Sequence, residues 1–323
     1  MRFTLCIPTM NAREHWPGFW TAVQTQTIHP EEVIVIDSAS TDDTAELAQA
    51  SGARVIRIER SEFRHGAARQ LAAELAGEVD CLLYMTQDAV LAERDSVHRL
   101  LSRFDDPRIA AAYGRQLPRK GADPIEAHAR LFNYPDNSAV RSLDDAPVVG
   151  FKTIFFSNAF GAYRRAALMR VGGFPIEARF GEDTQVVANM LLAENKIAYA
   201  ADATVVHSHA FSLAQEFHRY FDIGRMHASE GWLERRFGGT GGEGMRFVRS
   251  ELTYLAHNAP HLVPAALIRS ATKFMAYQHG KRSAASAKQR KELIAREANK
   301  LRSSNLDAGL ANQSHNLVSR FDD

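Results

Sequence analysis

Cysteine is scarce in this sequence: its 323 residues include only Cys6 and Cys81. Both lie in apolar, strand-like runs, which indicates buried thiols in a reducing compartment rather than a disulfide framework. Long apolar runs are missing as well. No segment approaches the ~20 consecutive apolar residues that a membrane span requires, and the first residues lack the apolar core of a signal peptide. We therefore expect a cytoplasmic protein whose membrane contact, if it has one, is peripheral.

The glycine-rich motifs of common nucleotide-binding folds are also absent. The first apolar run is followed by PTMNAREH and not by a G-x-G-x-x-G turn, and no Walker loop occurs. The formal net charge is +1, so no overall field favours nucleic acid or an acidic partner. The charge is uneven, however, because residues 264–303 contain ten Lys or Arg and only two acidic residues.

Strand-like and helix-like segments alternate through the first 85 residues. The expected strands are Phe3–Ile7, Val33–Ile36, Arg54–Ile58 and Asp80–Met85, and the expected helices are 16–26, 41–49 and 67–76. Such repeated units predict an α/β fold with a mostly parallel central sheet and helices on both faces, which binds ligands beyond the carboxyl ends of its strands. Asp37 and Asp88 both fall at such ends.

The second half of the chain is less regular. The expected elements are one or two strands in 151–163, helices at 164–171, 182–194 and 212–227, and a strand at 198–207. Residues 238–244, GGTGGEG, hold five glycines in seven positions and are predicted to form a linker. A basic, mostly helical region, 245–303, and a polar tail, 304–323, are expected to follow.

Four short strings lie at predicted loops: IPTMNA (7–12), VIVIDSASTDDT (33–44), TQDA (86–89) and FGEDTQ (180–185). In this order and at these separations they resemble the inverting family-2 nucleotide-sugar glycosyltransferases of the GT-A (Rossmann-like) fold. The resemblance covers roughly residues 1–225. It implies a catalytic domain over 1–237, with nucleotide-sugar binding in 1–115 and the acceptor and catalytic part in 116–237, followed by a C-terminal helical extension.

Further strings narrow the resemblance: FRHGAARQ (63–70), TQDA, GRQLP (114–118) and HSHAFS (207–212). Within the family they look most like bacterial rhamnosyltransferases that use dTDP-L-rhamnose to build surface polysaccharides. The implied reaction passes the sugar to a saccharide on a lipid carrier or on a growing polysaccharide. Two alternatives stay open: a UDP-hexose donor with the same machinery, and a non-catalytic nucleotide-binding or scaffold protein.

Transfer of a sugar from a nucleoside diphosphate requires the leaving diphosphate to be neutralised, and a divalent cation such as Mg²⁺ or Mn²⁺ can do this. The family's D-x-D motif corresponds to Thr86-Gln87-Asp88, which makes Asp88 the implied metal ligand and puts Gln87 where an acid commonly contacts the ribose. The alternative is that Asp88 only caps a following helix. His207 and His209 alternate at the end of a strand, so they share a face and either could complete the metal shell or simply pack.

Glu182 and Asp183 open a predicted helix, where the helix dipole favours anions and depresses a carboxyl pKa. Capping of that helix is therefore one interpretation of the pair. The resemblance instead assigns both residues to the catalytic part of the site, with Asp183 as the general base that deprotonates the acceptor hydroxyl. A single displacement would invert the anomeric configuration. By the same analogy, Asn158 lies near the acceptor.

The loops after the first two strands carry Thr9, Asn11, Asp37 and Ser38, which the resemblance assigns to the nucleoside. Many relatives have a second Asp, which recognises uracil, at the position of Ser38. Its absence weakens the assignment of UDP and leaves room for thymidine.

Three arginines are candidates for donor contacts. Arg64 and Arg69 could contact the base or the phosphates, and Arg219 could clamp the leaving diphosphate. The alternative for all three is an ordinary solvated arginine.

Two interpretations of the basic region 245–303 remain. It could be an amphipathic region on anionic lipid at the cytoplasmic face of the inner membrane. Alternatively, it could be a helical hairpin that packs on the catalytic domain or on a second subunit in a homodimer. Nucleic acid is not an expected partner because aromatic residues are not interleaved with the charges.

Overall fold

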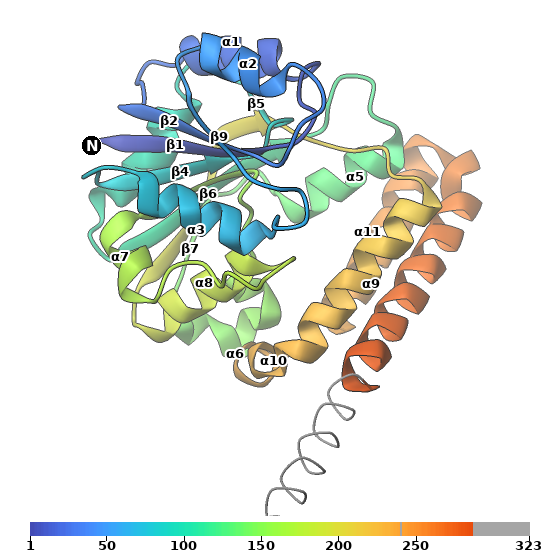
Figure 1. Cartoon of the computed structure of the whole chain (residues 1–323). Helices are drawn as coiled ribbons and strands as arrows, with labels where there is room; N and C mark the ends of the chain where they lie inside the picture. Colours follow the sequence, from blue (N-terminus) through green and yellow to red (C-terminus); the bar gives the residue numbers. More distant parts are fainter. Residues whose placement is uncertain (240, 287–323) are drawn as a thin grey trace, which may run out of the picture.

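The structure, a computed structural model, describes residues 1–239 and 241–286. Its centre is a nine-stranded sheet in the order β3-β2-β1-β4-β8-β6-β9-β5, with β7 paired to β9 (Figure 1). The strands are β1 (Phe3–Thr9), β2 (Glu32–Asp37), β3 (Arg54–Arg57), β4 (Cys81–Met85), β5 (Val90–Leu91), β6 (Ile109–Leu117), β7 (Ala139–Arg141), β8 (Phe160–Arg164) and β9 (Lys196–Val206).

Most strands of this sheet run in one direction. β1 pairs in parallel with β2 and β4, β2 with β3, and β6 with β9, whereas β8 lies antiparallel between β4 and β6, and β5 and β7 run antiparallel to β9. The register brings Thr9 opposite Asp37 at the carboxyl ends of β1 and β2. The mostly parallel sheet predicted from the sequence is thus confirmed, and the loops after β1, β2 and β4 meet at one edge.

Helices cover both faces of the sheet. One core joins α1, α2 and α4 to one face, and a second core joins α3, α7, α8 and α10 to the other. The helices are α1 (Trp16–Gln24), α2 (Thr44–Ala50), α3 (His65–Leu75), α4 (Ser96–Leu101), α5 (Pro124–Asn133), α6 (Ala146–Val149), α7 (Arg165–Arg170), α8 (Glu182–Leu192), α9 (Leu213–Ser229), α10 (Gly231–Phe237) and α11 (Gly241–Asn258). A further helix spans 263–286.

The prediction of strand structure across 151–163 is wrong for its first half. Gly150–Ile154 form a 3₁₀ turn, and only Phe160–Arg164 pair into the sheet. The apolar residues of 151–157 are buried without a strand because Phe155 and Phe156 pack their rings against Tyr113. The loop that results, which contains Ser157 and Asn158, enters the site described below.

The linker predicted at 238–244 is wrong for Gly241–Gly244, which form the first turn of α11. Glycine costs about 1 kcal/mol in a helix interior relative to alanine, and tertiary contacts offset part of that cost here. Lys152 pairs with Glu243 at 2.9 Å and so fastens the start of α11 to the catalytic domain.

The C-terminal helices pack on the rest of the fold. Ile125 of α5 forms a small core with Leu255 of α11, and helix 263–286 (orange-red in Figure 1) runs beside α9. These two helices approach each other closely because Gly224 and Gly280 each face the backbone of the other helix. A Cβ on Gly224 would lie 2.2 Å from the Tyr277 carbonyl oxygen. None of the helices described is both long and apolar enough to cross a bilayer.

Candidate active site

Asp88, His207 and His209 converge into one cluster. The loop after β4 supplies Asp88, and the segment after β9 supplies the two histidines. His207 Nε2 lies 3.4 Å from Asp88 Oδ1, His209 Nε2 lies 3.2 Å from Asp88 Oδ2, and the two Nε2 atoms are 3.0 Å apart. Neighbouring ligands of a cation bound at about 2.1 Å are separated by roughly 3.0 Å in an octahedral site and 3.4 Å in a tetrahedral one. The three side chains therefore fit a divalent cation.

Hydrogen bonds orient His207 toward this cluster. Gln116, buried at the end of β6, directs its Oε1 at His207 Nδ1 (2.8 Å), and Arg130 of α5 donates to the same oxygen at 2.6 Å. Since an amide oxygen only accepts, Nδ1 carries a proton. Nε2, which faces Asp88, is then the nitrogen that a metal would bind in place of a proton. Burial, and next His207, lower the pKa of His209.

The Asp88 carboxyl is held in its ionised form. Burial alone would raise its pKa, but the hydrogen bond and the charge interaction with His207 hold the pKa below its ordinary value, with smaller effects from Thr86 and His209. The alternative that Asp88 caps a following helix is wrong, because the next element is the short strand β5.

Asp183 lies in the first turn of α8, where the helix dipole was expected to depress its pKa. The structure gives the opposite result. Burial, followed by the negative charge of Glu182, raises the pKa of Asp183 to about 7, although backbone N–H groups of Thr184 and Asn158 donate to its carboxylate. The side chain keeps part of its surface in solvent. A half-buried carboxyl with this pKa is suited to proton transfer near neutral pH.

Glu182 is held in the interior. Its Oε1 accepts from Arg69 Nη1 at 2.6 Å and from Asn158 Nδ2 at 3.2 Å, and its exposed fraction is 4%. Burial favours the neutral acid, but Arg69 and then His65 outweigh it and lower the pKa of Glu182. Arg69, a candidate for donor contacts, thus has a buried ionic partner in Glu182. The charge of Glu182 in turn raises the pKa of Asp183.

Hydrogen bonds and one peptide bond connect the cluster of Asp88, His207 and His209 with Asp183. Gln116, which contacts His207, donates through Nε2 to Ser157 Oγ at 2.8 Å. The next residue, Asn158, donates its backbone N–H to Asp183. The two acids proposed from the sequence, Asp88 and Asp183, are thus linked through Gln116, Ser157 and Asn158.

Arg219 of α9 lies between the two halves of this site. Its guanidinium is 5.5 Å from the ring centre of Phe180, just before α8, and 5.7 Å from that of Phe211, just after the histidines. The side chain is exposed and has no carboxylate partner among the ion pairs of residues 1–239 and 241–286. A cation held in this way is available to an anionic ligand.

Thr9, Asn11, Asp37 and Ser38 meet at the carboxyl edge of β1 and β2. Thr9 Oγ1 donates to Asp37 Oδ1 at 3.1 Å, and Ser40 links Asp37 to the backbone of Asn11. Ser38 is 1% exposed, and its Oγ has no hydrogen-bond partner within the described part of the chain.

Two residues assigned to the donor have local partners. Gln87 forms a two-way amide pair with the backbone of Met10 (2.8 and 3.0 Å), so it joins the loops after β1 and β4. Arg64 donates to the carbonyls of Ser61 and Phe63 and is not linked to the other candidates by these bonds.

Gln116 lies in the string GRQLP, but sequence reasoning gave it no role, and it missed Arg130 and Ser157. All three contact the site through residues distant in the sequence, so their roles could not be read from local patterns. A further signal for Gln116 is that it and Arg115 are polar at the end of an otherwise apolar run, IAAAYG.

Comparison with solved structures supports a GT-A architecture. A mannosyltransferase from Pyrobaculum calidifontis, solved in complex with GDP-Man and Mn²⁺, matches with a TM-score of 0.54 and 20% identity over 91% of this chain and 80% of the other. At this identity the likeness concerns the fold alone. The fold is of the GT-A class.

The sequence comparisons identify the family. The model of glycosyl transferase family 2 matches residues 4–172. The O-antigen chain rhamnosyltransferase RfbN of Salmonella typhimurium is 45% identical over 282 residues, which is 87% of this chain and 90% of RfbN. WbaN of Salmonella anatum, also an O-antigen chain rhamnosyltransferase, is 45% identical over 280 residues, 86% of this chain and 89% of WbaN. The chain belongs to glycosyl transferase family 2 and is a glycosyltransferase.

Proposed function

We propose that this enzyme transfers L-rhamnose from dTDP-L-rhamnose to a saccharide acceptor of O-antigen type, with inversion, by a single displacement. The observation that carries the proposal is the connection from the Asp88–His207–His209 cluster through Gln116 and Ser157 to Asn158, whose backbone N–H donates to Asp183. The 45% identity to two O-antigen chain rhamnosyltransferases supports the sugar and the acceptor class.

Asp183 is the proposed general base. Its pKa of about 7 leaves a large fraction ionised at neutral pH while keeping it basic enough to take the proton of an acceptor hydroxyl. Glu182 maintains this pKa by its charge, and Asn158 fixes the carboxylate by its backbone N–H. Arg219 is placed to contact the departing diphosphate.

Asp88, His207 and His209 are the proposed ligands of Mn²⁺. When bound, the ion would neutralise charge that develops on the leaving diphosphate. Two imidazole nitrogens favour Mn²⁺ over Mg²⁺, because Mg²⁺ prefers a shell of hard oxygen ligands. Gln116 and Arg130 hold His207 with its Nε2 directed at the cluster.

Thymidine is the proposed base of the donor. The buried Ser38 hydroxyl, which has no partner within the described residues, stands where many relatives carry an acid for uracil. A panel of nucleotide sugars, assayed by release of the nucleoside diphosphate, tests this point. Turnover with dTDP-L-rhamnose is expected, and turnover restricted to a UDP-sugar would favour the UDP-hexose alternative and reject thymidine.

Asp183→Asn tests the catalytic role directly. The amide keeps the shape of the side chain but cannot accept the proton, so we expect kcat to fall at least a hundredfold with little change in donor affinity. Asp88→Ala should instead weaken donor binding and abolish the dependence on Mn²⁺. The exposed Asp136 provides a matched control, because Asp136→Asn should leave turnover unchanged. Near wild-type turnover by Asp183→Asn would reject the assignment of the base.

We further propose that the enzyme acts in the cytoplasm, where nucleotide sugars are made, on an acceptor attached to a lipid carrier or to a growing polysaccharide. The absence of a membrane-spanning helix among the described residues is compatible with either acceptor. Assay of a lipid-linked and a lipid-free saccharide side by side separates the two.

A further inference from the structure

Helix 263–286 has an unusually apolar exposed face. Leu267, Ile268, Phe274 and Met275 are 49%, 57%, 65% and 60% exposed. The spacing i, i+1, i+7 and i+8 puts these side chains on one face of the helix. Scattered exposed hydrophobic residues are normal, but a contiguous group of this kind marks an interaction surface.

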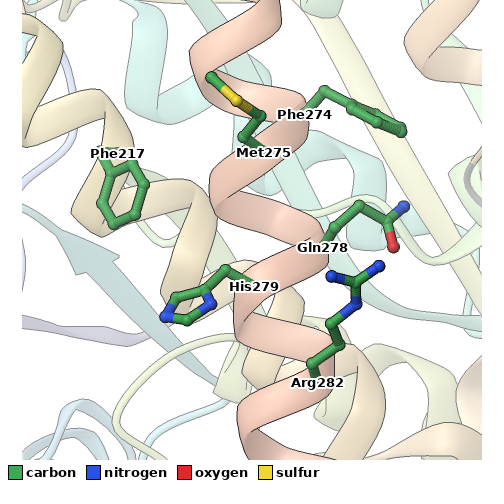
Figure 2. Close-up of a pocket in the computed structure, with 6 residues that line it drawn as sticks. All are labelled: Phe217, Phe274, Met275, Gln278, His279 and Arg282. Atoms are coloured by element: carbon green, nitrogen blue, oxygen red, sulfur yellow. The ribbon is translucent and has the colours of Figure 1, made fainter.

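The apolar face continues into a shallow groove beside α9. Figure 2 shows its lining, with Phe217 of α9 to one side of helix 263–286 and with Phe274, Gln278 and Arg282 on the other side of its axis. We define the outer face of this helix as the exposed residues Leu267, Ile268, Phe274, Met275 and Arg282 together with the half-buried Gln278.

The charge of the helix is of one sign. Residues 263–286 include four Lys or Arg and no acidic residue. Arg269 and Lys273 turn inward to Glu216 (3.1 and 3.3 Å), and Lys281 pairs with Glu234 at 3.0 Å. Arg282 is exposed at the end of the apolar face.

We propose that the outer face docks on an anionic phospholipid surface. Phe274, Met275 and their apolar neighbours can enter the boundary between headgroups and acyl chains, while Arg282 meets anionic headgroups. A second copy of this chain fits less well, because the outer face offers no acid with which Arg282 of the other copy could pair.

The position of the helix relative to the active site supports this partner. Arg269 Nη1 donates to the Phe211 carbonyl at 2.9 Å, two residues after His209. Docking through the outer face therefore holds the histidine segment close to the membrane. This inference rests on the proposed function, because the enzyme would meet a lipid-linked acceptor at the membrane surface.

Vesicle sedimentation with the full chain tests the proposal. Vesicles of phosphatidylethanolamine with about 30% phosphatidylglycerol are compared with vesicles of phosphatidylcholine alone, at low and physiological salt. Wild type should partition about fivefold more strongly onto the anionic vesicles, since one cation near an anionic surface contributes about 1 kcal/mol. The double variant Phe274→Ser/Met275→Ser should lose tenfold or more of this partition, and Arg282→Glu should lose several-fold. Val148→Ser provides the control, because Val148 is 90% exposed on α6, outside this face.

Equal partition of wild type and the double variant would overturn the proposal, as would equal binding of neutral and anionic vesicles. Light scattering without vesicles tests whether a second copy of the chain covers the face instead. If wild type is a dimer, the double variant is a monomer and vesicle binding is unchanged, the face belongs to a second copy. Asp183→Asn separates this inference from the proposed function, because it should bind vesicles like wild type whether or not Asp183 is the base.

Discussion

The pKa of Asp183 gives the proposed mechanism a measurable signature in the pH dependence of turnover. With a pKa of about 7, the ionised base is depleted below neutrality, so kcat/KM should be about tenfold lower at pH 6 than at pH 8. Glu182→Gln removes the adjacent charge that raises this pKa. Charges within roughly 8 Å interact by about 2 kcal/mol near a protein surface, so the acid limb of the profile should move to lower pH by at least about one unit.

The assay follows release of the nucleoside diphosphate between pH 5.5 and 8.5. Glu177→Gln is the matched control, because Glu177 is an exposed acid in the loop before α8 and should leave the limb in place. Glu182→Gln also deprives Arg69 of its buried partner, which costs about 3 kcal/mol of stability. Its profile is therefore recorded well below its melting temperature.

Loss of Mn²⁺ from protonated histidines could mimic this acid limb. Profiles at two Mn²⁺ concentrations separate the causes, because a limb set by metal loss moves with the concentration and one set by Asp183 does not. An unchanged limb in Glu182→Gln, or a wild-type profile that stays flat down to pH 5.5, would refute the argument.

Three further predictions follow from particular contacts. Gln116→Leu removes the acceptor that fixes the tautomer of His207, so the Mn²⁺ concentration for half-maximal turnover should rise 10- to 100-fold; an unchanged Mn²⁺ titration would count against this role. Asp183→Asn should unfold at higher urea concentration than wild type at pH 8 but not at pH 3.5. Because the folded-state pKa of Asp183 is raised, the wild-type protein loses stability as the pH rises from about 4 to 7 and the carboxyl ionises, whereas the amide does not ionise. The expected gain at pH 8 is about 1 kcal/mol after allowance for the partial exposure of this residue. Gly280→Ala would place a Cβ 2.1 Å from the Phe221 carbonyl oxygen and should lower the free energy of unfolding by at least about 2 kcal/mol, whereas Gly18→Ala, with no atom within 4 Å of its Cβ, should not destabilise the protein.

The sequence was most informative where function depends on residues close together in the chain. The pattern of strands and helices in the first 85 residues matched the structure because each strand is short, apolar and bounded by turn or capping residues. The alternation of His207 and His209 likewise predicted their shared face, and their association with Asp88 came from the family resemblance.

The parts that could not be predicted depend on contacts between distant segments. β6 was missed because its first half, IAAAYG, is rich in alanine and glycine and has little preference for a strand. Gln116 could not then be placed beside His207, although β6 and β9 pair and the backbone N–H of His207 donates to Leu117. The raised pKa of Asp183 was also beyond sequence reasoning, because burial, which only the fold determines, outweighed the helix dipole.

The contacts of α5 give the C-terminal helices a role in the active site. One side of α5 presents Arg130 to Gln116 and Glu126 to Ser208, the residue between the two histidines. The other side packs against α11, where His128 contacts Ser250 at 2.9 Å. Together with the bond from Arg269 to Phe211, these contacts fasten the histidine segment to the C-terminal layer from two directions. The proposed metal site would then depend on helices outside the residues matched by the family model, so a chain that ends before α11 should lose Mn²⁺ affinity even where the sheet still folds.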